Sequence, residues 1–138
     1  MNWKTSLGLA VLAISVGAVV SMNDSSTSLI ANILEEKKPV YRHFVMFKFE
    51  ESAKPEQIQG VVDAFKALPG KIDTIKGFEM GTNVSPEGHD KGFTHGFLVT
   101  FDDKAGLEKY LPHPAHKEFG GSLKGILKDV LVFDYVTN

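Results

Sequence analysis

Two segments whose side chains alternate and are apolar on both sides constrain the fold most. Residues 41–49 read Tyr-Arg-His-Phe-Val-Met-Phe-Lys-Phe, and residues 93–101 read Phe-Thr-His-Gly-Phe-Leu-Val-Thr-Phe. A period of two, with aromatic and β-branched side chains, predicts β-strands whose successive side chains lie on opposite faces. In the first segment Val45 and Phe47 share one face, and Phe44 and Met46 share the other. We therefore expect a sheet that is at least partly buried on both faces.

The rest of the domain predicts two helical regions and two more strands. A helix is expected from Ser52 or from Lys54-Pro55-Glu56, because apolar residues follow at helical spacing until Pro69-Gly70 ends it. A strand over residues 75–84 and a turn-rich loop then lead by a hairpin into the strand over 93–101. Asp102 or Asp103 is expected to cap a short helix that reaches Tyr110.

The end of the chain completes a β-α-β-β-α-β order. A further helix is expected from Pro114 to about Lys128, and residues 130–135 are expected to form a strand of high β propensity. This order predicts an α+β, ferredoxin-like fold, in which helices cover one face of an antiparallel sheet. Because the other face is apolar here, we expect it to pack against a second subunit in a homodimer.

The first residues predict export. Residues 1–21 combine Lys4 with an uncharged apolar run, which is typical of a signal peptide or, if uncleaved, an N-terminal anchor. Val19-Val-Ser21 and Val16-Gly-Ala18 are competing cleavage sites. Residues 22–39 are expected to be a polar linker and residues 40–138 one domain. The protein is thus expected outside the cytoplasm, touching a membrane only through an uncleaved N-terminal segment.

Composition narrows the functional classes. The chain has 15 basic and 17 acidic residues, so it lacks the positive field that nucleic acid binding requires. It has no cysteine, so neither a disulfide nor a thiol nucleophile is available. Its glycines lack the strand-to-helix context of a phosphate-binding loop, and we expect no cofactor.

The segment Tyr110-Leu-Pro-His-Pro-Ala-His116 is the strongest candidate site. Its prolines should end one helix at Leu111, hold His113 extended and begin the next helix at Pro114. His116 would then lie in the first turn, where the helix dipole favours a neutral imidazole that can accept a proton.

Together, residues 43–49, 92–95, 110–116 and 132–135 resemble the stress-responsive dimeric A/B barrel (Dabb) family. The resemblance implies a ferredoxin-like fold that pairs sheet to sheet into a dimeric α/β barrel. A polyketide cyclase of this family implies His116 as the catalytic base with Tyr110 beside it, and His43 and His95 in the cavity. Phe65 stands where that cyclase has a tyrosine, so a hydroxyl that could hold a substrate oxygen is missing.

Two functional classes therefore remain open. One is a homodimer that binds a small apolar or aromatic molecule in a pocket formed by His43, His95, Phe65 and His113. The other is a cofactor-independent enzyme, a cyclase or a monooxygenase, that uses His116 and Tyr110. Each histidine could instead be structural, with its ring bonded to neighbouring backbone. A metal site built from the histidines is a weaker alternative, because a kinked turn does not fix the spacing of the ligands. We therefore predict no metal.

Overall fold

The computed structural model describes residues 38–138, so the predictions for residues 1–37 lie outside the described residues. No helix within residues 38–138 has the length and apolar character needed to cross a membrane. The elements are β1 (Tyr41–Phe49), α2 (Pro55–Lys66), the 3₁₀ turn η1 (Leu68–Gly70), β2 (Gly77–Thr82), β3 (His95–Phe101), α3 (Lys104–Tyr110), α4 (Pro114–Ser122) and β4 (Leu127–Val136).

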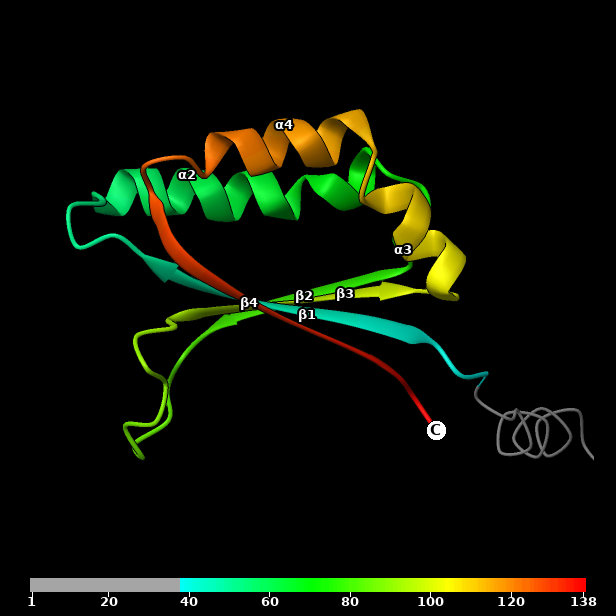
Figure 1. Ribbon diagram of the computed structural model, residues 1–138, viewed down its shortest axis with the longest axis horizontal. Coiled ribbons are helices and arrows are strands. Elements are labelled where there is room, and N and C mark those ends of the chain that lie inside the picture. Colours follow the sequence, from blue (N-terminus) through cyan, green and yellow to red (C-terminus); the bar gives the residue numbers. More distant parts are fainter. Residues whose placement is uncertain (1–37) are drawn as a thin grey trace, which may run out of the picture. The chain divides into compact units, whose positions relative to one another are not determined.

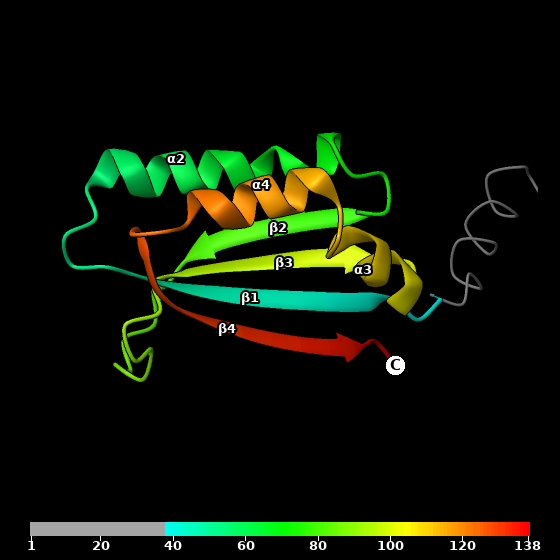
Figure 2. The same ribbon diagram turned by 45° about the horizontal axis from the view of Figure 1, so that its top comes forward.

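The four strands form one antiparallel sheet in the order β2-β3-β1-β4. The helices lie on one side of this sheet, and the loop between β2 and β3 extends away from the sheet on the other side (Figure 1). Figure 2 shows β2 and β4 as the two edge strands. This is the predicted ferredoxin-like, α+β arrangement, so the fold expected from the order of elements is confirmed.

Local signals set the helix boundaries. The backbone N–H of Lys54 donates to Gln57 Oε1 at 2.9 Å, and Pro55 provides the first residue of α2. Asp103 Oδ1 accepts from the Gly106 N–H at 3.0 Å and caps α3, as expected. Leu111 ends α3, and the extended His113 precedes Pro114 at the start of α4, which confirms the geometry predicted from the two prolines.

The predicted boundaries of four elements are wrong. The last helix ends at Ser122 and not near Lys128, since it contains the poor helix formers Gly120 and Gly121 and is followed by Gly125 at φ 77°. Leu127 and Lys128 were predicted to be helical but belong to β4, which begins at Leu127. The strands β2 and β3 are also shorter than expected, because turns occupy the loop ends: Asn83 Oδ1 accepts from the Ser85 N–H, and the Phe93 N–H donates to the Asp90 carbonyl.

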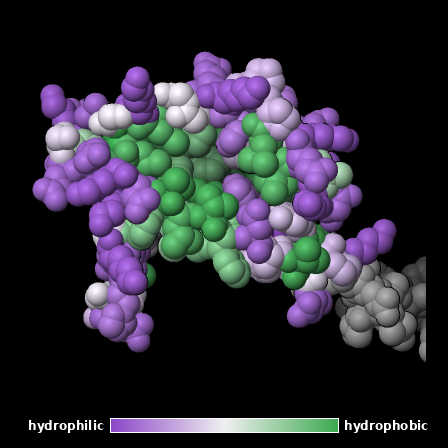
Figure 3. Space-filling model, viewed as in Figure 1, coloured by the Kyte–Doolittle hydropathy of each residue, from purple (hydrophilic) through white to green (hydrophobic). Residues whose placement is uncertain are grey.

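The core lies between the helices and the sheet. The Phe65 ring is 4.5 Å from the Phe97 ring and 4.6 Å from the Phe119 ring, centroid to centroid, so α2, β3 and α4 meet in one aromatic cluster. On the other face of the sheet, Phe44 and Met46 are only partly buried. Apolar residues also gather at the surface in the orientation of Figure 1, around the middle of the molecule (Figure 3). The helices therefore bury one face and leave apolar side chains on the other.

Candidate functional site

A cavity of about 200 Å³ lies between the α3–α4 corner and the helix-facing side of β1 and β4. Its polar side chains are His43, Tyr110 and His116. One wall is β4, where Val130 is 46% exposed and Val132 is 51% exposed. The remaining lining is mostly apolar: Val45, Phe47, Phe65, Leu111, Phe119, Gly120 and Leu123.

The proline corner brings Tyr110 and His116 together. Tyr110 is the last residue of α3, and His116 lies in the first turn of α4. Because Pro112 and Pro114 restrict the backbone between them, the two helices reverse direction sharply. The Tyr110 and His116 ring centroids are 4.2 Å apart. The sequence spacing that suggested a site therefore produces direct ring contact.

His116 is held so that one nitrogen remains free. Its Nδ1 lies 3.0 Å from the Leu111 carbonyl oxygen, so Nδ1–H donates and Nε2 carries the lone pair when the ring is neutral. Burial lowers the pKa of His116, and the nearby His43 and His113 lower it further, while the Leu111 carbonyl opposes them. The neutral imidazole was expected from the helix dipole; the main cause is burial instead.

Tyr110 is a buried phenol. Its side chain is only 1% exposed, and burial raises the pKa of its hydroxyl above the ordinary value. The phenol therefore stays protonated at neutral pH. Within residues 38–138 no side-chain hydrogen bond engages this hydroxyl, so it is available to donate to an oxygen atom in the cavity.

Asp134 is a site residue that the sequence analysis missed. Its Oδ1 lies 2.7 Å from His43 Nδ1, and its Oδ2 accepts from the Tyr41 hydroxyl at 3.3 Å. His43 is only 6% exposed, and its ring centroid is 6.0 Å from that of Tyr110. A signal existed in the antiparallel pairing of β1 with β4, which places His43 opposite Asp134. Using it required knowing the register between strands 91 residues apart.

The structure does not bring all the predicted residues together. His43, Phe65, Tyr110 and His116 line the cavity. His95 lies at the start of β3 against Phe49, with ring centroids 5.1 Å apart, and burial lowers its pKa. His113 Nδ1 accepts from the Ala115 N–H at 3.2 Å and caps α4. Within residues 38–138 no three His, Cys, Asp or Glu side chains are grouped so that they could share a metal ion.

Two plant proteins are similar to this chain in sequence. The chain is 36% identical over 102 residues to the stress-response A/B barrel domain-containing protein HS1 of Arabidopsis thaliana, covering 74% of this chain and 94% of HS1. It is 28% identical over 94 residues to olivetolic acid cyclase of Cannabis sativa, covering 68% of this chain and 93% of the cyclase.

Solved structures agree with the fold. A crystal structure from Jannaschia sp. CCS1, described as a dimeric ferredoxin-like protein, matches with a TM-score of 0.61 and 29% identity, covering 70% of this chain and 97% of that chain. The family model described as the stress responsive A/B barrel domain matches residues 41–137, which include all four strands and all three α-helices of the described domain. The chain therefore belongs to the stress-responsive A/B barrel (Dabb) family.

Proposed function

We propose that this protein is a homodimer that binds a small apolar or aromatic molecule in the cavity beside Tyr110 and His116. The proposal rests on the composition of that cavity, in which apolar walls surround three polar side chains, His43, Tyr110 and His116. Ligand sites typically combine an apolar lining with a few placed polar groups. The dimeric relative from Jannaschia supports the homodimer.

The size and polarity of the cavity select the ligand class. Its volume of about 200 Å³ is below the roughly 300–1,000 Å³ of common ligand pockets. A single aromatic ring that carries one or two oxygens fits these dimensions. The ring would contact the apolar wall, and one oxygen would accept from Tyr110 or donate to His116 Nε2.

Paired titrations of phenol and toluene test the binding proposal. NMR titration of the labelled protein should give tighter binding of phenol, with the largest shift changes in the amides around the cavity. Tyr110→Phe should weaken phenol binding about 5- to 10-fold, as expected for one lost hydrogen bond, and leave toluene unaffected. Equal shifts throughout the surface, or no binding of either probe, would contradict the proposal.

Proton abstraction is the second candidate function. His116 Nε2 is unprotonated, and the Tyr110 phenol lies against the His116 ring. His116 could remove a proton from a carbon between two carbonyl groups, and Tyr110 could donate a hydrogen bond to the resulting enolate oxygen. Either an aldol condensation or a cofactor-free oxygenation by O₂ would begin with this proton abstraction, and the similarity to olivetolic acid cyclase supports the cyclase alternative. Phe65 lacks a hydroxyl, which disfavours the cyclase's own substrate.

Deuterium exchange of a small β-diketone separates the two functions. If His116 is a general base, the protein accelerates exchange at the central carbon, and His116→Gln reduces the acceleration about 10²- to 10⁴-fold. His89→Gln is the matched control, because His89 is exposed in the β2–β3 loop. Binding without any accelerated exchange would leave the binding function and reject the catalytic one.

Export completes the proposal. Its support is the apolar, uncharged run that follows Lys4. Expression of the full chain with fractionation should recover the protein outside the cytoplasm, and sequencing of its N-terminus should give a new first residue if the segment is cleaved. Recovery of the uncleaved chain entirely in the cytoplasm would refute export.

A further inference from the structure

The cavity of the proposed function has a buried inner end and an exposed outer end. At the inner end, the lining residues of β1 and α2 are at most 6% exposed. At the outer end the lining is about half exposed and apolar: Leu111 46%, Val130 46% and Val132 51%. We call these three residues, together with the exposed Gly120, the cavity mouth. The cavity is therefore closed inside and apolar where it meets solvent.

Gly120 leaves a gap in the side of α4 that lines the cavity. His116, Gly120 and Leu123 are four and three residues apart and all line the cavity, so they lie on one side of the helix. A Cβ at Gly120 would meet no atom within 4 Å, so the space beside it is unfilled. The φ of Gly120 is not positive, so the backbone does not require glycine there. Gly120 thus widens the mouth one helical turn from His116.

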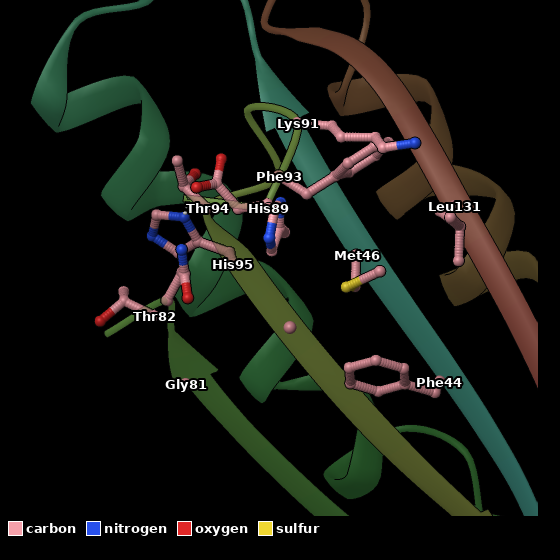
Figure 4. A pocket seen from close by; sticks show the side chains of 13 residues that line it. Phe44, Met46, Gly81, Thr82, His89, Lys91, Phe93, Thr94, His95 and Leu131 are labelled. Atoms are coloured by element: carbon pink, nitrogen blue, oxygen red, sulfur yellow. Dashed lines mark hydrogen bonds between the residues drawn. The ribbon is translucent and has the colours of Figure 1, made fainter. Parts of the chain in front are cut away.

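The sheet separates the cavity from a larger depression. The face that the helices leave uncovered, the open face, carries a depression of about 620 Å³. In Figure 4 its side chains Phe44, Met46 and Leu131 lie along β1 and β4. Because side chains alternate along a strand, the cavity is lined instead by Val45 and Val132, and it shares no lining residue with the depression. A ligand that is too long for the cavity therefore extends through the mouth and not through the sheet.

We infer that the ligand carries an apolar tail, which leaves the cavity over Gly120 and lies against the other residues of the mouth. This inference rests on the proposed binding function and adds the ligand class, a single-ring head with an alkyl tail of several carbons. The cavity of about 200 Å³ holds the ring, with its oxygen at Tyr110 and His116. The tail covers the apolar surface of the mouth, which a bare ring leaves in water. Gly120 is then the residue that determines whether a tail is accepted.

Tail length should therefore raise the affinity. A methylene that moves fully out of water improves binding about fourfold, and one that is covered on one side improves it about twofold. The four carbons of 4-butylphenol should thus give binding about tenfold tighter than that of phenol. In NMR titrations of the full-length, methyl-labelled protein, 4-butylphenol should shift the methyl groups of Val130 and Val132 more than phenol does. Larger shifts at Met46 and Leu131 would place the tail on the open face and contradict the inference.

A branched side chain at Gly120 tests the path of the tail. Gly120→Val adds two methyl groups to the mouth, in space that is open in the single chain. It should remove the tenfold preference for 4-butylphenol and change phenol binding less than about threefold. Gly121→Val is the matched control, because Gly121 is also in α4 with nothing within 4 Å of a Cβ but does not line the cavity. This control should keep the preference.

Circular dichroism checks that both valine variants fold. Gly120→Ala adds a single methyl group and favours the helix, so it should fold and lose part of the preference even if the valine variant does not fold. Wild-type protein that fails to bind phenol overturns the proposed function. Wild-type protein that binds phenol in the cavity without preferring 4-butylphenol overturns the tail alone. Equal preference in the Gly120 and Gly121 variants overturns the path over Gly120.

Discussion

Single imidazole nitrogens decide what the cavity can do. A neutral imidazole has one donor and one acceptor nitrogen, so the partner of one nitrogen fixes the role of the other. The Leu111 carbonyl engages Nδ1 of His116, and the Asp134 carboxylate engages Nδ1 of His43. His113 is used in the opposite sense, because its Nδ1 accepts a backbone N–H. Two of the three rings therefore leave Nε2 as the acceptor.

Removal of the Asp134 carboxylate should destabilise the domain. Asp134→Ala leaves the buried His43 Nδ1–H without its partner, which we expect to lower the free energy of unfolding by about 2 kcal/mol. Asp134→Asn keeps an acceptor oxygen and should cost about half as much. Urea denaturation at one fixed protein concentration measures both, with Asp129→Ala as the control on the same strand. A cost at Asp134 no larger than at Asp129 would show that the contact to His43 is not stabilising.

Lowered histidine pKa values should make the fold less stable in mild acid. Burial lowers the pKa of His116 and of His95 below the ordinary value of 6.5. As the pH falls through 6.5, the unfolded chain binds protons that the folded chain does not, so the free energy of unfolding decreases. The decrease should end once the pH is below the folded pKa values. His116→Gln should reduce the change in the free energy of unfolding between pH 7 and the folded pKa values, and His89→Gln should not.

The residues of the site differed in how far the sequence could predict them. Tyr110 and His116 contact each other because two nearby prolines shape the chain, and that is local information. Asp134 reaches His43 only through the register of β1 with β4. His95 shares the aromatic face of β3 yet lies at its first residue, beyond the cavity. Local geometry was therefore predictable, and convergence from distant strands was not.

The helix α3 offers a test at the level of elements. Gly106 lies inside this helix, where alanine normally gains up to about 1 kcal/mol through helix propensity. A Cβ at Gly106 would approach Phe101 Cβ to 2.9 Å, and Phe101 is fully buried. We expect Gly106→Ala to be destabilising by about 1–3 kcal/mol, because overpacking outweighs propensity. Gly60→Ala in α2, with nothing within 4 Å, should instead be stabilising; thermal melts of the two variants should shift in opposite directions. Equal upward shifts would show that Phe101 yields at no cost.

Element types were easier to predict than element ends. Period-two and helical patterns extend over many residues, so β1, α2 and β3 follow directly from them. The end of α4 instead depends on the competition between helix propensity and pairing with β1. After Gly120 and Gly121 weaken the helix, residues from Leu127 onward extend β4 along β1. Propensity at one position cannot decide such a competition.

For the whole molecule, the order of elements determined the topology, but not the shape of the cavity. The β-α-β-β-α-β order and the requirement for short connections leave few alternatives. The cavity instead arises where side chains from three or more elements meet, and its volume depends on the register and packing of those elements. A sheet that is apolar on both faces nevertheless predicts that its open face binds a second copy of the chain.

Amide hydrogen exchange in the edge strand β4 should show whether a second copy covers the open face of the sheet. It pairs with β1 alone, and most of its residues are exposed on both faces. In a single chain such a strand opens locally at low free energy, whereas β1 and β3 are held between neighbours. Covering the exposed Leu131, Phe133 and Tyr135 of β4 with a partner should therefore slow amide hydrogen exchange in residues 127–136 as protein concentration rises, with no change in β3. Phe133→Ser should keep β4 exchange fast at every concentration, whereas Val84→Ser, at a 90% exposed loop position, should behave as the wild type. Exchange in β4 that is slow and independent of concentration down to full dilution would mean that β1 alone holds the strand, and with it the Asp134 contact to His43.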